Sequence, residues 1–273
     1  MKVRNLLIVT SLYFLFKILI FSLESQKYLD VVFFDVGQGD SILITTPGNK
    51  RVLVDGGETY DIDMKIDKRT VFPFCNFDLV FVTHTDSDHI GGLTHLLQRC
   101  FAKHVRFNDV SCDSKTCQNF ASIISKFDTK NVYAGDEFWI DNVYIKVLWP
   151  TKEYINEGLD NSNNSSTVLF VDYKDFEMLL TGDAEGEILG KIDIMGILPL
   201  IQGDLDVYKV SHHGSINGLN KELLLELKPK NCVISVGKND YGHPHQQVLS
   251  FFEEIGCVVK RTDVSSDIEF KVF

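Results

Sequence analysis

Short apolar runs alternate with polar loops along most of the 273 residues. The runs at 28–35, 41–46 and 51–55 predict strands, because each is short, rich in β-branched or aromatic residues and bounded by turn residues. Further strands are predicted at 78–82, 104–108, 132–133, 138–140, 143–149, 167–171, 177–183, 206–210, 231–236, 257–261 and 267–272. Helices are predicted at 93–100, 116–127, 184–192, 219–227 and 246–255. The polar stretch 58–74 predicts no clear element, and 150–161 reads as a loop.

The order of these elements is strands, loop and helix, repeated in a second series. This order predicts an α/β fold in which two sheets pack together with helices outside, a four-layer αβ/βα sandwich. Aspartate or histidine stands at the ends of several predicted strands, at positions 55, 84–89, 183, 212–213 and 243. Because sites in such folds gather at the carboxyl ends of strands, we expect these side chains to converge.

The first 27 residues are predicted to be separate from a single domain at 28–273. Lys2 and Arg4 precede an apolar run from Leu6 to Leu23, which is near the lower limit for spanning a bilayer. Lys17 interrupts that run, and no clear small-residue cleavage site follows it. We favour an uncleaved signal-anchor over a cleaved signal peptide, with a membrane-anchored or exported chain whose catalytic domain is extracytoplasmic.

Composition excludes global disorder and disfavours a passive nucleic-acid binder. Hydrophobic residues make up 44% of the chain, and the net charge is −11, whereas nucleic-acid binders usually carry a basic surface. The six cysteines form no zinc-ribbon pair. Cys112 and Cys117 could bridge a small loop in an oxidising compartment, and six ordinary buried thiols are an equally good interpretation.

Four metal-capable side chains lie within six residues, between the strand at 78–82 and the helix at 93–100. They are His84, Asp86, Asp88 and His89. Imidazole is the commonest protein metal ligand, and carboxylates suit harder cations. The alternative is a polar loop that caps the helix, but one aspartate would be enough for that. We therefore favour a metal site, and expect His95 and His104 to be surface or satisfied core residues.

Six motifs occur along the chain in a fixed order. They are DVGQGDS at 35–41, VDGG at 54–57, THTDSDHIGG at 83–92, LLTGDAE at 179–185, KVSHHGS at 209–215 and YGHPH at 241–245. From about Tyr28 to its C-terminus, the chain resembles the metallo-β-lactamase fold hydrolases. Asp86, where most members carry a second histidine, resembles the ComEC-type subgroup, the soluble domain of a DNA internalization-related competence protein.

The resemblance implies a centre of two divalent metal ions. His84 and Asp86 would serve one metal, while Asp88, His89 and His212 would serve the other. Asp183 would bridge the two metals, and Asp88 and Asp183 would also orient the attacking hydroxide. His213 and His243 would contact the scissile group. The site floor or substrate contacts would be Asp35, Gln38, Asp40, Asp55, Asn163, Ser166 and Ser215.

Two departures from the wider superfamily affect these expectations. Most members place another histidine before the bridging aspartate, whereas here, as in the ComEC branch, 163–166 reads Asn-Asn-Ser-Ser. The first metal is therefore short of nitrogen ligands. Imidazoles favour Zn and the carboxylate at 86 favours Mn, so we lean to Mn in function with Zn as an alternative occupant. The chain also lacks the multi-span channel of true ComEC proteins, so we do not expect it to form the uptake channel.

The leading functional hypothesis is a metal-dependent phosphodiesterase, most simply a DNA nuclease, whose partners are DNA or another phosphodiester and the membrane. A nuclease needs a basic rim, for which the sequence offers Lys209, Lys221, Lys228, Lys230 and Lys238. A second hypothesis is a periplasmic hydrolase of small esters, lactones or β-lactams. A third is a non-catalytic scaffold. Because neutral imidazoles bind the metal, activity should fall on the acid side.

Overall fold

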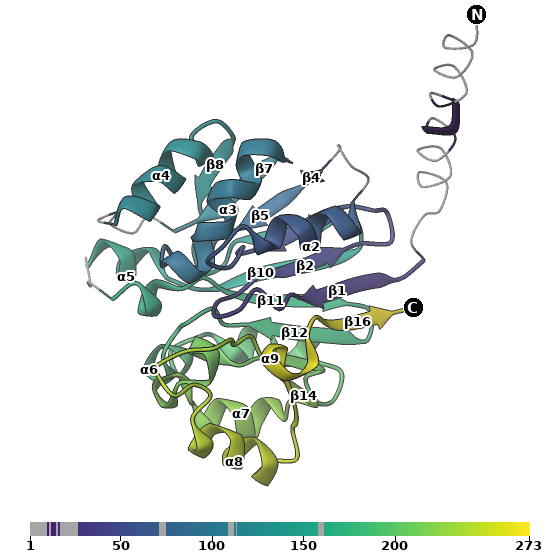
Figure 1. Ribbon diagram of the computed structural model, residues 1–273. Helices are drawn as coiled ribbons and strands as arrows, with labels where there is room; N and C mark the ends of the chain where they lie inside the picture. Colours follow the sequence, from purple (N-terminus) through teal and green to yellow (C-terminus); the bar gives the residue numbers. More distant parts are fainter. Residues whose placement is uncertain are drawn as a thin grey trace, which may run out of the picture.

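Two seven-stranded sheets form the centre of the molecule in the computed structural model (Figure 1). The residues it describes are 10, 12–14, 16, 27–70, 75–108, 112, 114–157 and 161–273. The first sheet has the spatial order β16 (Ile268–Val272), β1 (Leu29–Phe33), β2 (Ile42–Thr45), β3 (Arg51–Val54), β5 (Leu79–Phe81), β7 (His104–Phe107) and β8 (Asp128–Asn131). The second has the order β15 (Val258–Arg261), β14 (Asn231–Ile234), β13 (Val207–Lys209), β12 (Phe176–Leu180), β11 (Val168–Tyr173), β10 (Val143–Trp149) and β9 (Glu137–Ile140).

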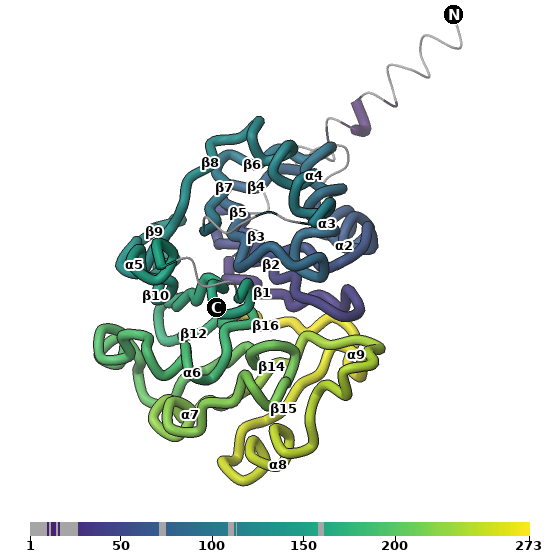
Figure 2. The backbone as a smooth tube through the Cα atoms, turned by 90° about the vertical axis from the view of Figure 1, so that its left-hand side faces the viewer, coloured from purple at the N-terminus to yellow at the C-terminus, as the bar shows by residue number. Residues whose placement is uncertain are grey.

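Helices cover the outer face of each sheet, so the predicted four-layer sandwich is confirmed. The first sheet is covered by α2 (Asp61–Arg69), α3 (Ser87–Arg99) and α4 (Lys115–Ile124). The second is covered by α6 (Gly186–Leu189), α7 (Lys221–Leu227) and α8 (Gln246–Glu254). A third apolar cluster joins the inner faces of the two sheets. Figure 2, turned by 90°, shows the same two halves stacked one above the other.

The two sheets share one pattern of strand directions. In the first sheet, β16, β1, β2 and β3 pair antiparallel, and β3, β5, β7 and β8 pair parallel. In the second, β9 to β12 pair antiparallel, and β12 to β15 pair parallel. Parallel strands end at the same edge of a sheet, so the loops after β3, β5, β12 and β13 can supply one site from both sheets.

Several predicted boundaries were wrong, each for a local reason. The stretch without a predicted element contains α2, in which only Ile62 and Ile66 are buried, so its apolar stripe is too narrow to stand out. The strand predicted at 132–133 lies instead at β8, a polar edge strand with little apolar alternation. The helix predicted at 93–100 begins earlier, at Ser87, because the metal-type motif itself forms its first turn.

Smaller elements complete the fold. The loop predicted at 150–161 contains α5 (Lys152–Asn156), and the helix predicted at 184–192 is reduced to α6. β4 (Asn76–Phe77) pairs with β6 (Phe101–Ala102), and α9 (Thr262–Ser265) precedes β16. Within the described part of the chain, no helix has the length and apolar content needed to cross a membrane. The signal-anchor prediction concerns residues 1–27, most of which lie outside the described residues.

Candidate metal centre

Donor atoms from both sheets meet in one buried cluster. His84 follows β5, while Asp88 and His89 lie in the first turn of α3. Asp183 follows β12 and His213 follows β13, so these two come from the second sheet. The side chains form two close groups at this point, His84–His89–Asp183 and Asp88–His89–His213. In each group, one donor atom from each residue lies within 4.8 Å of the others. Residues separated by more than a hundred positions therefore converge, as the strand-end pattern predicts.

Each of the three histidines is oriented by a hydrogen bond at Nδ1. His89 Nδ1 donates to Asp55 Oδ2 at 2.8 Å, and His213 Nδ1 donates to the Ser235 carbonyl at 2.8 Å. His84 Nδ1 lies 3.1 Å from the hydroxyl of Thr83, which itself donates to Asp55 at 2.6 Å. These contacts direct every Nε2 toward the cluster, the arrangement found where histidine binds a metal.

The atoms that point into the cluster have no hydrogen-bond partner. They are Nε2 of His84, Nε2 of His89, Nε2 of His213 and Oδ1 of Asp183, all buried. Buried polar atoms are almost always satisfied, so four such atoms without a hydrogen bond in one place indicate a ligand site. Three imidazole nitrogens and a carboxylate oxygen form a donor set that a divalent cation fits.

Charge pairing dominates the metal-free cluster. Burial alone would lower the pKa of His213, but the carboxylates of Asp183, Asp88 and Asp40 outweigh it and raise the pKa to about 9. The pKa of His89 is likewise raised, because Asp183 and Asp55 outweigh its burial. Conversely, these histidines hold the pKa of Asp183 well below its usual range despite burial. The side chains of the cluster therefore form a set of buried ion pairs.

We expect metal loading at pH 7 to release protons. His213 keeps its proton in the metal-free protein because its pKa is about 9, whereas a metal takes the neutral imidazole. Apparent metal affinity should therefore weaken as the pH falls below about 9. Calorimetry in buffers of different ionisation enthalpy measures this release, and a binding heat that does not depend on the buffer would contradict it.

The same shift contributes to the pH dependence of stability. A folded-state pKa raised from 6.5 to about 9 stabilises the fold fully below pH 6.5. This contribution is lost as the pH rises through 9.

Two further residues predicted as metal ligands, Asp86 and His212, lie beside the cluster. Asp86 is partly exposed, with Oδ2 3.7 Å from His84 Nε2, and contact with His84 lowers its pKa. His212 Nε2 lies 4.0 Å from Asp183 Oδ2, farther than His213 Nε2, which lies 3.3 Å from the same atom. Neither Asp86 nor His212 belongs to a close donor group among the described residues. Their ligand roles stay predictions.

Residues predicted for the site floor divide into two kinds. Asp40 and Asp55 are buried beside His89 and form a third close group with it. Ser166 is buried, and its hydroxyl accepts the Asp183 N–H at 3.1 Å. The other four predicted floor residues form hydrogen bonds with backbone N–H groups of nearby loops. Asp35 Oδ1 accepts the Gly37 N–H, and Ser215 Oγ accepts the Asn217 N–H. Gln38 Oε1 accepts the Gly237 N–H, and the Asn163 carbonyl accepts the Ser166 N–H.

Strained backbone accompanies the cluster. Asp55, His212 and His213 have φ of 57°, 48° and 53°, in the left-handed region that non-glycine residues rarely adopt. Such conformations persist where the surroundings enforce them, commonly at functional sites. Gly39 meets a related constraint, because a Cβ there would lie 2.0 Å from the Asp88 carbonyl. Only glycine lets the loop after β1 approach the start of α3 so closely.

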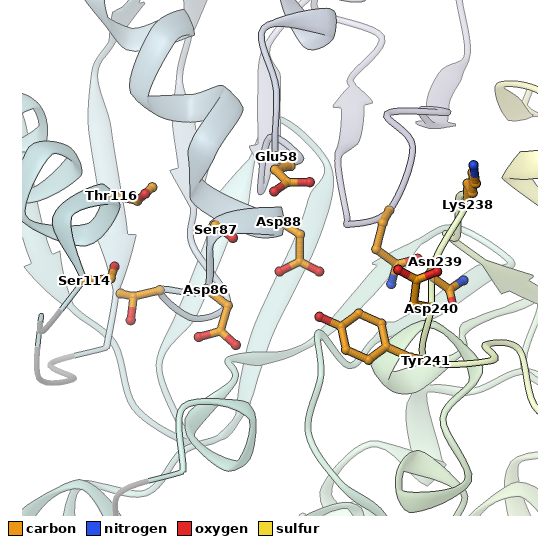
Figure 3. A pocket seen from close by; sticks show the side chains of 12 residues that line it. Glu58, Asp86, Ser87, Asp88, Ser114, Thr116, Lys238, Asn239, Asp240 and Tyr241 are labelled. Carbon is orange, nitrogen blue, oxygen red and sulfur yellow. The ribbon is translucent and has the colours of Figure 1, made fainter.

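An open cavity of about 690 Å³ adjoins the cluster (Figure 3). Asp86 and Asp88 point into it from the start of α3, and the ring of Tyr241 faces them from the loop after β14. Tyr241 is 73% exposed, and its ring centroid lies 5.8 Å from that of His243. Burial and neighbouring histidines lower the pKa of His243 to about 4, so this ring is neutral at pH 7.

Lys209 does not lie on a basic rim, and that prediction was wrong. Its side chain is entirely buried beside Asp40, as a charge at the end of an inner strand must be paired. The other predicted rim lysines are exposed, and only Lys238 lines the cavity. Sequence reasoning also missed Thr83 and Ser235 as supports for the histidines. Thr83 stands inside the conspicuous motif, whereas a supporting carbonyl such as that of Ser235 leaves no sequence signal.

A profile of the Metallo-beta-lactamase superfamily matches residues 34–238. The chain belongs to the metallo-beta-lactamase superfamily. Members of this superfamily bind divalent metals, often two, and the donor groups described above suit that chemistry. The fold is the metal-dependent hydrolase fold of the superfamily.

Curated relatives confirm the ComEC-type resemblance within the metallo-beta-lactamase superfamily. ComE operon protein 3 of Bacillus subtilis (strain 168) is 32% identical over an alignment that covers 91% of this chain and 33% of that protein. Recombination protein 2 of Haemophilus influenzae is 27% identical over 94% of this chain and 31% of that protein. The chain thus spans about a third of the length of these relatives.

Solved structures support the metallo-beta-lactamase fold itself. YhfI of Bacillus subtilis, a metallo-beta-lactamase fold protein, superposes with a TM-score of 0.54 and 13% identity, covering 90% of this chain and all of that one. CmlA, a diiron beta-hydroxylase from Streptomyces venezuelae, superposes with a TM-score of 0.58 and 13% identity over 90% of this chain and 54% of that one. At such low identity these similarities establish fold alone.

Proposed function

We propose that this chain is a metal-dependent phosphodiesterase that cleaves nucleic acid, most simply DNA. The supporting observation is the convergence of unpaired Nε2 atoms and the Asp183 carboxylate beside an open, polar cavity. The names of the relatives, a ComE operon protein and a recombination protein, favour a nucleic-acid substrate over other phosphodiesters. Both relatives are about three times longer than this chain, so their complete activities do not transfer to it.

We assign His84, His89, His213, Asp88 and Asp183 as the residues that would hold the metal pair, with Asp86 completing the half nearest His84. This assignment prefers His213 to His212 because His213 Nε2 lies 3.3 Å from both Asp88 Oδ2 and Asp183 Oδ2. A bound metal pair lowers the pKa of water and stabilises the attacking and leaving oxygens of an in-line displacement. The carboxylate at 86 favours Mn, and the three imidazoles accommodate Zn.

The side chains at the edge of the cluster suit the remaining steps. Asp88 projects toward the cavity, where its carboxylate can orient the attacking water (Figure 3). His243 is half-buried and neutral at pH 7, and the one N–H of its neutral ring can donate a hydrogen bond to a phosphate oxygen. Its ring contacts that of His212 at a centroid distance of 5.4 Å, so both imidazoles would face the same part of a bound substrate.

The proposal is tested by incubating purified protein with Mn²⁺ or Zn²⁺ and labelled single- or double-stranded DNA. We expect metal-dependent cleavage that a chelator stops. Parallel assays use nitrocefin and a simple lactone, because the acidic cavity also fits the second candidate, a hydrolase of small neutral esters. Cleavage of these compounds without cleavage of DNA would replace the proposal with that candidate. Absence of all cleavage by metal-loaded protein would favour a non-catalytic scaffold.

The disulfides support an extracytoplasmic location for this activity. The structure pairs all six cysteines, as Cys75–Cys100, Cys112–Cys117 and Cys232–Cys257. The interpretation of six free thiols was therefore wrong, and two of the three pairs were not foreseen. Disulfides persist in oxidising compartments and are rare in the cytosol of mesophiles. The proposed site of action is consequently the outer side of the cell membrane.

Tyr241 is expected to supply a stacking surface for a base next to the cleaved phosphate. Its exposed ring is tilted by 31° from that of His243, which extends an aromatic row from the cluster to the cavity edge. Stacking on an aromatic side chain contributes about 1–3 kcal/mol per base, so Tyr241→Ala should raise KM for single-stranded DNA roughly tenfold with little change in kcat. Tyr241→Phe keeps the ring and should behave like the unmodified protein. Equal KM values for all three would contradict this role.

A further inference from the structure

Lys209 is a wholly enclosed charge at the centre of the molecule. It is the last residue of β13, and none of its side chain is exposed. Its ammonium contacts Asp40 Oδ2 at 2.5 Å and donates to the Gly182 carbonyl at 3.1 Å. It also lies 3.8 Å from Asp183 Oδ1. A buried ammonium is costly to desolvate, and here three oxygen atoms lie close enough to compensate that cost.

The partners of Lys209 come from opposite halves of the fold. Asp40 belongs to the loop between β1 and β2 of the first sheet. The backbone of Asp40 forms hydrogen bonds with two segments of the first half that belong to the site. Its N–H donates to the carbonyl of Asp88, a proposed ligand, at 3.3 Å. Its carbonyl accepts the N–H of Gly57, in the loop after β3, at 2.7 Å. Lys209 therefore connects the second sheet to the start of α3 through one ion pair.

Within the second half of the fold, Lys209 contacts the turn that carries Asp183. Gly182 precedes that aspartate with φ of +50°, and its carbonyl accepts both the Lys209 ammonium and the His212 N–H at 3.2 Å. The Thr181 hydroxyl donates in turn to the Lys209 carbonyl at 2.9 Å. The turn is thus tied to β13 from two sides, which leaves the carboxylate of Asp183 directed at His89 and His213.

The donor set is divided between these two halves. His84, Asp88 and His89 are attached to the first sheet, whereas Asp183 and His213 are attached to the second. Ligands must be held within about 0.5 Å of the geometry that a cation requires. A link between the sheets at the depth of the donors is therefore where metal affinity can be set.

We propose that Lys209 is a positioning residue whose ion pair with Asp40 fixes the first-sheet ligands relative to Asp183 and His213 and thereby sets metal affinity and stoichiometry. This inference rests on the metal centre of the proposed function. Lys209 itself contacts neither metal nor substrate in this role. A merely structural ion pair would change stability and leave the metal site unaltered.

The test measures Co²⁺ binding to the full chain by competition with a chromophoric chelator, together with the visible spectrum of bound Co²⁺. We expect Lys209→Met to weaken binding by roughly tenfold to a hundredfold, as loss of supporting residues typically does, and to change the spectrum. Lys230→Met is the matched control, because its amine forms a comparable pair with Asp206 at 2.8 Å on the surface. This control should bind Co²⁺ like the unmodified protein.

A second variant covers the case in which Lys209→Met does not fold. Asp40→Asn is nearly isosteric, keeps an acceptor for the lysine and removes the ion pair, so it should also weaken Co²⁺ binding at least about tenfold. The inference is overturned if whichever variant folds binds Co²⁺ with unchanged affinity, stoichiometry and spectrum. Failure of the unmodified protein to bind Co²⁺, Mn²⁺ or Zn²⁺ would instead overturn the proposed function.

Discussion

Replacing Asp183 with asparagine is expected to abolish detectable metal-dependent cleavage, a loss of at least roughly a thousandfold. The carboxylate is buried, with Oδ1 3.4 Å from His89 Nε2 and Oδ2 3.3 Å from His213 Nε2. An amide retains the shape but loses the charge and one of the two acceptor oxygens. Metal content, measured by inductively coupled plasma mass spectrometry, should fall at least about tenfold.

The same substitution alters the protonation of its neighbours. Burial lowers the pKa of His89 and His213, and the charge of Asp183 is the largest influence that opposes it. Without that charge, both imidazoles should lose their protons more easily, so metal loading of Asp183→Asn should release fewer protons at pH 7. The variant is expected to remain folded, because losing the buried anion also makes the neighbouring imidazoles easier to neutralise.

Asp128→Asn provides a matched control for Asp183→Asn. Asp128 Oδ2 lies 2.6 Å from His104 Nδ1, so it is also an aspartate paired with a histidine, but on the surface. Exposed pairs contribute little to stability, so this variant should keep both metal and activity. A folded Asp183→Asn protein that binds metal and cleaves DNA at the rate of Asp128→Asn would remove Asp183 from the proposed centre.

Convergence of the donors was predictable because strand direction constrains it. A parallel strand presents its terminal residue at the same edge as its neighbour, so aspartate or histidine after β3 and β5 gathers at one edge of the first sheet, and after β12 and β13 at one edge of the second. His84 follows the end of β5 by three residues, and His212 follows the end of β13 by the same number. The shared pattern of the two sheets thus brings equivalent loops to one site, although no sequence repeat is visible.

The particular histidine at the second-sheet loop was not predictable from spacing. His212 and His213 are adjacent, and both have left-handed backbone, which rotates their side chains away from the alternation of an extended strand. The carbonyl of Ser235, on a neighbouring loop, accepts the Nδ1 hydrogen of His213, and Nε2 of the same ring faces Asp88 and Asp183. Such a contact depends on the packing of the whole second sheet, and a local motif carries no trace of it.

The burial of Lys209 shows a similar limit. The KVSHHGS motif places a lysine before two histidines, which resembles a basic substrate contact when the sequence is considered alone. Inner strands of a two-sheet sandwich are covered on both faces, so a lysine there has no access to solvent. Its partner, Asp40, lies 169 positions earlier in the chain, and only the packing of one sheet on the other brings them together.

Reduction of the disulfides is expected to lower the melting temperature by roughly 15 °C or more. Cys75–Cys100 and Cys232–Cys257 each close 25 residues of chain, and each contributes about 3–4 kcal/mol by restricting the unfolded state. Both join neighbouring parallel strands, since Cys75 and Cys100 directly precede the paired residues Asn76 and Phe101. Scanning calorimetry of protein produced in an oxidising compartment, with and without reductant, measures the difference.

The third disulfide provides a comparison for the predicted loss of stability, because it closes a shorter loop. Cys112–Cys117 closes only five residues, so its removal by serine substitution should cost about 2 kcal/mol, less than removal of Cys232–Cys257. Mass spectrometry after alkylation under denaturing conditions counts the free thiols directly. Six alkylated cysteines in unreduced protein would show that the pairs do not form, and would remove the main support for action outside the cytoplasm. Paired cysteines with an unchanged melting temperature on reduction would show instead that sheet packing alone holds β14 against β15.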